Sequence, residues 1–178
     1  MMKNKIEEII RHNDIMDFKW IQPNSIIFGE WVRMKCMYGC GNYGKRANCP
    51  PNVPPVSQCK EFINEYNQIV IMHFENKFEK PEERLPWTIE INKNIVNAER
   101  EIFLAGFYKA FALLTDSCRI CKECSDNRDK CNNKKYSRPA PDAFGIDVYK
   151  TARSNGFSIN VLKELNAKMD RFAFLLIE

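Results

Sequence analysis

The sequence predicts an α/β fold, a single-domain sandwich in which helices cover a central, mostly parallel sheet. Apolar stretches with strand character alternate with amphipathic stretches of helical spacing along the chain. The 178 residues are enough for one hydrophobic core, and neither a repeat nor a linker divides residues 1–178. Two cysteine-rich loops follow predicted strand ends, where open α/β sheets usually hold ligands.

The first half of the chain alternates helical and extended patterns. Residues 3–11 carry isoleucines on one helical face and predict a short amphipathic helix. Residues 25–34 predict a strand that ends where the first cysteine loop begins. A serine cap predicts a helix over 57–66, and the apolar run 68–74 predicts a buried strand. Two prolines predict a loop over 78–87.

The second half continues the alternation. Apolar residues at helical spacing predict a helix over 88–105, followed by a strand over 107–114 that leads into the second cysteine loop. A proline start predicts a helix over 141–154. Residues 158–162 predict a short strand or the start of a turn of helix, and the apolar residues 171–177 predict a terminal strand.

Composition narrows the classes of function. The chain is 44% hydrophobic and 28% charged, as in ordinary globular proteins, and its net charge of +4 is too small to indicate nucleic-acid binding. The chain begins without a secretion signal, and no apolar run approaches the roughly 20 residues of a membrane span. We therefore expect a cytoplasmic protein without membrane partners. In that compartment, grouped cysteines hold metal more often than they form disulfides.

The second cysteine loop contains Cys118, Cys121, Cys124 and Cys131. Three thiolates at Cys-x2-Cys-x2-Cys spacing can surround one side of a [4Fe–4S] cluster, and a further cysteine completes the set. Six residues separate Cys131 from Cys124, enough for the chain to bring Cys131 back to the same cluster. Structural zinc held by four cysteines is the alternative. The even, close spacing favours iron–sulfur, because zinc sites usually present separated pairs.

The first cysteine loop contains Cys36, Cys40 and Cys49 among several glycines. Glycine lets backbone amides approach an anionic centre closely. Cys59 lies on the apolar face of its predicted helix, which indicates a buried structural thiol rather than a ligand. Three protein ligands would leave one iron open, and open metal positions are where catalysis occurs. If Cys59 or Cys131 completes the set, electron transfer or structural support is favoured.

Other candidate ligands are few. His12 lies near the end of the first predicted helix, where a cation suits the helix dipole. His73 lies within an apolar strand and is interpreted as a hydrogen-bonded strand residue. Arg138 and Asp142 could position an anion or a cluster ligand near the second loop. We favour a structural role for both, at the entry to a helix.

Three motifs in order resemble a known family: Tyr43-Gly44-Lys45 with Cys49-Pro50-Pro51, the second cysteine loop, and Arg138 to Val148. The chain is similar, over nearly its whole length, to a family of unknown function described as predicted metal-binding proteins and common in anaerobic bacteria and archaea. The resemblance implies metal binding, with iron–sulfur as the expected metal, and it supplies no reaction.

These observations predict a protein that binds one or two [4Fe–4S] clusters through the seven loop cysteines and exchanges electrons with a redox partner protein. The first alternative is a non-redox iron–sulfur enzyme that uses an open iron in the first loop. The second is a zinc-stabilised binding module, in which tyrosines such as Tyr38 and Tyr43 beside Lys45 would stack on RNA bases.

Overall fold

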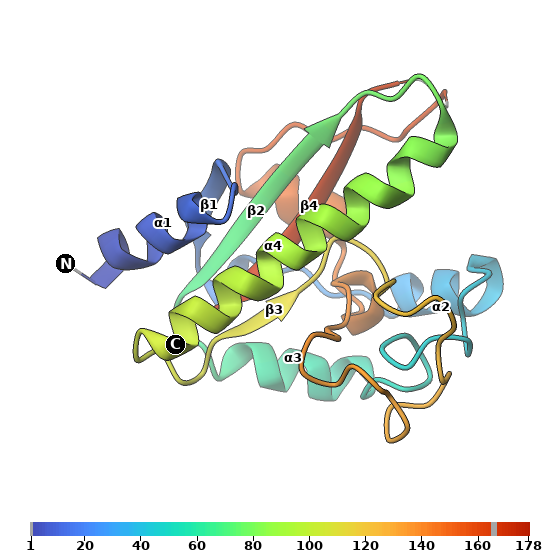
Figure 1. Cartoon of the computed structure of the whole chain (residues 1–178), viewed down its shortest axis with the longest axis horizontal. Coiled ribbons are helices and arrows are strands. Elements are labelled where there is room, and N and C mark those ends of the chain that lie inside the picture. The colour runs from blue at the N-terminus through green and yellow to red at the C-terminus, as the bar shows by residue number, and fades with distance from the viewer. Residues whose placement is uncertain (1, 165–166) are drawn as a thin grey trace.

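The computed structural model describes residues 2–164 and 167–178 (Figure 1). The described residues form one four-stranded sheet, five α-helices and three single turns of 3-10 helix. None of the helices in these ranges is long and apolar enough to cross a membrane. The elements are α1 (Met2–His12), β1 (Asp17–Ile21), η1 (Pro23–Ser25), α2 (Glu30–Gly39), α3 (Val56–Asn64), β2 (Ile69–Asn76), η2 (Pro81–Glu83), α4 (Arg84–Leu104), β3 (Phe111–Leu113), η3 (Asp142–Phe144), α5 (Val148–Ser154) and β4 (Met169–Leu176).

The sheet is antiparallel throughout, so the prediction of a central, mostly parallel sheet is wrong. The strand order is β1-β2-β4-β3, and every neighbouring pair is antiparallel. Helix α4 does connect two strands that run in the same direction, β2 and β3. The terminal strand β4 lies between these two and runs against both. A pattern of alternating helices and strands indicates the crossover, but it does not show that a later strand separates the two parallel ones.

Helical segments cover both faces of the sheet. Helices α1 and α4 lie on one face, and α4 runs along the sheet in Figure 1. Helices α3 and α5 and the turn η3 pack on the other face. Because successive strand residues point to opposite faces, the two central strands divide their side chains between these cores. Val70, Met72, Ala173 and Leu175 face α1 and α4, and Ile69, Ile71, Phe172 and Phe174 face the opposite layer.

The strand predicted over 25–34 is wrong, because α2 begins at Glu30 and carries the chain as far as the first cysteines. Val32 is the buried residue of this helix, whereas Trp31 and Met34 are about half exposed. The apolar residues from Trp31 to Met34 therefore belong to a helix rather than to one face of a strand. As a result, the first cysteine loop follows a helix and not a strand end. The second cysteine loop does follow a strand, β3.

The edge strand β1 was missed, although its sequence Asp-Phe-Lys-Trp-Ile alternates polar and apolar side chains. Helices predicted over 3–11, 57–66 and 88–105 are confirmed, as are strands over 68–74 and 171–177, with ends shifted by a few residues. Three predicted segments require correction: 107–114 contains only the short strand β3, 78–87 includes η2 and the start of α4, and 158–162 contains no strand.

The helix predicted over 141–154 is broken into η3 and α5 by Gly145. This glycine has φ +79°. Its amide donates a hydrogen bond to Asp142 O, and its carbonyl accepts one from Gly29 N. A Cβ at this position would lie 2.7 Å from a methyl carbon of Val56 in α3. Only glycine combines this backbone conformation with so close an approach, so the turn that carries Asp142 is fixed against α3.

We expect Gly145→Ala to destabilise the protein by roughly 2–4 kcal/mol, from left-handed backbone strain together with overpacking against Val56. Gly44→Ala is the matched control, because Gly44 has φ +70° and open space around its Cα. The control should lose only the strain contribution, about 1–2 kcal/mol. Urea unfolding of both variants measures the difference, and equal losses would contradict the steric argument.

Candidate metal centre

The first cysteine loop is folded by a series of backbone turns. Cys36 lies in the last turn of α2, and Cys40 caps that helix, its amide donating to Cys36 O at 3.3 Å. Gly44 N then bonds Pro50 O at 2.9 Å, and Cys49 N bonds Arg46 O at 3.1 Å. These turns return the chain toward the end of α2. Cys36, Cys40 and Cys49 consequently line the same small cavity, of about 40 Å³.

The second loop brings Cys118, Cys121 and Cys131 close together. Burial raises the pKa of Cys118, and the charges of Cys121 and Cys131 would raise it further. Two thiols of this loop also accept hydrogen bonds from nitrogen donors. Asn133 Nδ2 donates to Cys121 Sγ at 2.9 Å, and Ala47 N of the first loop donates to Cys124 Sγ at 3.4 Å. Donors of this kind stabilise thiolate sulfur when it carries charge.

The two loops lie side by side, below the sheet in the view of Figure 1. Besides the contact to Cys124, Asn52 Nδ2 donates to Asp126 O at 2.7 Å, and Asn48 Nδ2 donates to Arg138 O. Asn48 is buried, so its amide needs a partner of this kind. Side-chain amides of the first loop therefore hold the backbone of the second, so the two cysteine loops adjoin.

The spacing of the thiols bears on which metal they could hold. Four thiolates around one zinc ion, each about 2.3 Å from the metal, lie about 3.8 Å from one another. Among the described residues, the only three ligand atoms within 4.8 Å of one another belong to His73, Glu75 and Asp170. Neither loop therefore brings three thiols to the spacing of a single ion.

Burial makes two thiols of the first loop, those of Cys36 and Cys49, weaker acids in the absence of metal. Loss of solvation, followed by the charge of Asp142, raises the pKa of Cys36 to about 11 and that of Cys49 to about 12. Burial also raises the pKa of Cys118. Thiolates are the form that binds metal, so binding must displace these protons. A positively charged centre would compensate for the charges that burial disfavours.

A groove of about 710 Å³ opens onto the first cysteine group. It shares Cys36, Cys40, Asp116 and Asp142 with the small cavity, so the two spaces meet at these side chains. Arg171 in the groove pairs with Asp116 at 3.5 Å. The groove is mainly acidic, and its charged residues are Lys35, Asp116, Asp142, Asp147, Asp170 and Arg171.

Asp142 is a site residue that the sequence interpretation missed in this role. Asp142 was expected near the second loop, but η3 places it beside the first group. It opens into the groove, yet the protein around its carboxyl displaces enough water to raise its pKa, and the charge of Asp116 raises it further. The sequence did place Asp142 within the Arg138 to Val148 motif, but that motif does not indicate which cysteine loop Asp142 lies beside.

Cys59 lies apart from both groups, as its position on the apolar face of a helix indicated. Its side chain is buried in the core beneath α3, with 1% of the residue exposed, and its thiol contacts Pro54 O at 3.5 Å. It lines a different cavity from the three thiols of the first loop.

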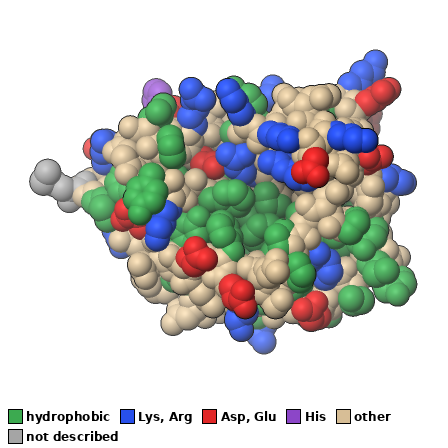
Figure 2. All heavy atoms as spheres, turned by 90° about the horizontal axis from the view of Figure 1, so that it is seen from below, with side chains coloured by type: hydrophobic (Ala, Val, Ile, Leu, Met, Phe, Trp, Pro, Cys, Tyr) green, Lys and Arg blue, Asp and Glu red, His purple; other side chains and the backbone are tan. Residues whose placement is uncertain are grey.

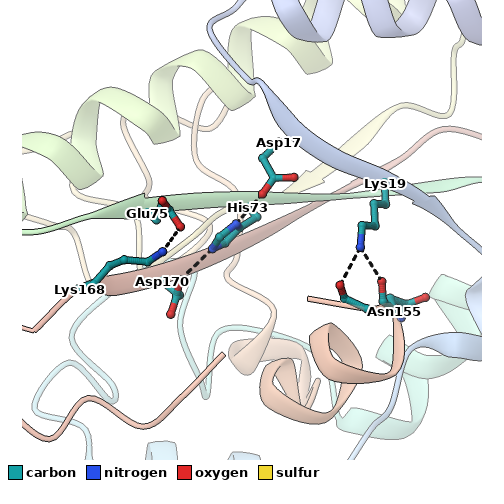
Figure 3. Close-up of polar contacts among 8 residues, drawn as sticks. Asp17, Lys19, His73, Glu75, Asn155, Lys168 and Asp170 are labelled. Carbon is teal, nitrogen blue, oxygen red and sulfur yellow. Dashed lines mark hydrogen bonds and ion pairs between the residues drawn. The ribbon is translucent and has the colours of Figure 1, made fainter. Parts of the chain in front are cut away.

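The histidines also lie outside the cysteine groups. His12 is exposed at the end of α1. His73 lies between two carboxylates, with Asp17 Oδ2 at 2.7 Å from Nδ1 and Asp170 Oδ1 at 2.9 Å from Nε2 (Figure 3). Lys168 pairs with Glu75 beside it. His73 is thus a hydrogen-bonded strand residue that ties β1, β2 and β4 together, as predicted.

A helix-covered antiparallel sheet with two adjoining loops of cysteines has the donor set of a thiolate-ligated metal protein. The family model described as predicted metal-binding protein (DUF2284) matches residues 19–177. The chain belongs to this family, which confirms the metal-binding family expected from the three motifs. No curated protein and no solved structure matches the chain.

Proposed function

We propose that the protein binds [4Fe–4S] clusters at the two cysteine groups and exchanges single electrons with a redox partner protein in the cytoplasm. Cys118, Cys121, Cys124 and Cys131 would hold one cluster, and Cys36, Cys40 and Cys49 would provide three ligands to another. A bound cluster of this type supplies reversible one-electron chemistry. The observation that carries the proposal is the pair of adjoining thiol groups, neither of which brings three sulfur atoms within 4.8 Å of one another among the described residues.

The residues around the thiols suit this role. The Ala47 amide and the Asn133 side chain donate to sulfur, and such bonds favour the more negative, reduced state of a cluster. The Ala47 contact also joins the first loop to a ligand of the second. Two clusters held this way would lie in one continuous region, a suitable arrangement for passing an electron between them.

The face that carries α3 suits an acidic redox partner. A hollow of about 590 Å³ separates α3 from the second loop and is lined by Phe62, Phe111 and Phe144 together with Arg128 and Arg138. Figure 2 shows hydrophobic side chains in a hollow on this face, with both basic and acidic side chains around it. The charged residues that line the hollow itself are both arginines, and an apolar centre with a basic lining fits a partner of opposite charge.

The direct test is strictly anaerobic purification of the full chain, followed by iron, sulfide and zinc analysis and by visible and paramagnetic-resonance (EPR) spectra. We expect about four iron and four sulfide per cluster, a brown protein, and an EPR signal that appears on reduction with dithionite. Stoichiometric zinc without iron in such material would refute the proposal.

A second candidate is a non-redox iron–sulfur enzyme. The groove of about 710 Å³ favours it, because this groove reaches the cysteine group that has only three thiols. A cluster with one exchangeable position could act there as a Lewis acid. Addition of cyanide to the reduced protein separates the two roles. A changed EPR signal supports an accessible iron, whereas an unchanged signal supports electron transfer alone.

A further inference from the structure

We infer that Asp142 is the fourth protein ligand at the first cysteine group, so that this site has three thiolates and one carboxylate. The inference rests on the proposed function and adds a ligand to it. Cys36, Cys40, Cys49 and Asp142 come from α2, the loop that follows α2, and η3, and they line the same small cavity. No sequence pattern joins them, because Asp142 lies more than ninety residues after Cys49.

No cysteine remains to fill the fourth position. The second loop has four thiols of its own, one of which, Cys124, is held toward the first loop by a single amide contact. Cys59 is buried behind α3 and lines a separate cavity. The first group must therefore take its fourth donor from another residue type or leave the position open.

Asp142 is better placed for this role than Asp116, the other carboxylate of the cavity. Asp116 is already engaged, since it accepts from Ser117 N at 2.6 Å and pairs with Arg171 at 3.5 Å. Asp142 lines this cavity together with Cys36, Cys40 and Cys49, and its carboxylate takes part in none of the ion pairs found among the described residues. Carboxylate oxygen is an accepted ligand for iron, harder than thiolate.

A buried hydroxyl that has no partner in the described part of the chain belongs to the lining of the same cavity. Ser117 lines the cavity and is 6% exposed, and its hydroxyl has no hydrogen-bond partner among the described residues. An unpaired buried hydroxyl is costly unless something occupies the cavity. An anionic cluster or its carboxylate ligand would accept this hydrogen bond.

The location of Asp142 gives this position a distinct chemistry. Its side chain lines both the small cavity and the large groove. A carboxylate binds iron less tightly than a thiolate does, because iron–sulfur clusters favour soft donors. The carboxylate corner is therefore the exchangeable one, and it is the corner that a molecule entering the groove would meet first.

The test compares Asp142→Cys and Asp142→Ala with wild-type protein, all purified anaerobically. We expect Asp142→Cys to change one of two EPR signals and to resist iron loss on mild ferricyanide oxidation. We expect Asp142→Ala to lose about one iron per chain under the same treatment, because one corner lacks a protein ligand. The unchanged signal of the second-loop cluster in each sample reports that the variant has folded.

Asp116→Asn is the matched control, since it removes a carboxylate charge from the same cavity. It should keep the wild-type EPR spectrum and iron content. The inference is overturned if both Asp142 variants match wild type, or if Asp116→Asn reproduces their changes. Wild-type protein that holds no iron would overturn the proposed function itself, and with it the inference. Iron-loaded wild type with unresponsive Asp142 variants overturns the inference alone.

Discussion

Replacement of Cys121 and Cys124 together by serine is expected to remove one complete cluster and to leave the other in place. Iron content should fall from about eight to about four per chain, and one of two reduced EPR signals should disappear. The reason is that these thiols belong to the second group alone, although Cys124 contacts the first loop through the Ala47 amide. Serine hydroxyls are poor substitutes for thiolates toward iron.

The reciprocal variant Cys36→Ser/Cys49→Ser should remove the other signal and the other half of the iron. Cys59→Ala is the control, because this thiol is buried in the core away from both groups. It should keep the full iron content while losing some stability to the cavity it creates. Loss of all iron from either double variant would contradict two independent clusters and would instead indicate one shared site.

Arg138→Met is expected to destabilise the protein by roughly 3–5 kcal/mol at neutral pH, because it leaves Glu99 buried without its charged partner. Arg138 Nε bonds Glu99 Oε1 at 2.9 Å, and only 6% of the Glu99 side chain is exposed. The same guanidinium donates to the carbonyls of Lys134 and Lys135. This one side chain thus anchors the end of the second cysteine loop on helix α4.

The loss of stability in Arg138→Met should depend on pH, and its direction follows from the pKa of Glu99. Burial raises the pKa of Glu99 even though Arg138 opposes the shift, so the folded state favours the protonated acid more than the unfolded chain does. Removal of Arg138 raises this pKa further. The penalty is therefore greatest where Glu99 is ionised, and it shrinks as pH falls through the raised pKa of the folded state.

Urea unfolding at pH 7 and pH 5 measures this trend, and Glu99→Gln in the Arg138→Met background separates charge from packing. The double variant should recover more than half of the lost stability and should lose the pH dependence of the difference. A loss that is equal at both pH values, or that Glu99→Gln does not relieve, would mean that packing of the Arg138 side chain dominates.

Local patterns were sufficient wherever a segment's own residues decide its structure. The isoleucine spacing of α4 and the apolar run of β2 each specify an element with one or two buried faces. Cys59 followed from the same logic, because Ile63, four residues further along α3, shares its helix face and is buried with it. The amphipathic pattern thus separated a core thiol from the loop thiols without any structural information.

Segments whose outcome depends on distant partners were predicted poorly. Residues 30–34 have strand character, yet they form the start of α2, which leaves Trp31 and Met34 about half exposed. Tertiary context overrides such weak local preference. Gly145 likewise gave no signal of the break between η3 and α5, since the reason for glycine there is the close approach of Val56 from another helix.

The sequence by itself determined that this protein is built to bind metal, because the type and spacing of thiol ligands are local properties of two short loops. It also determined which segments are helical or extended where a single amphipathic face decides. Only the tertiary structure decided that β4 inserts between β2 and β3, that the two loops adjoin, and that Asp142 lies beside the first thiols. These are contacts between residues distant in the chain, and their free energy comes from packing and hydrogen bonds that no local pattern encodes.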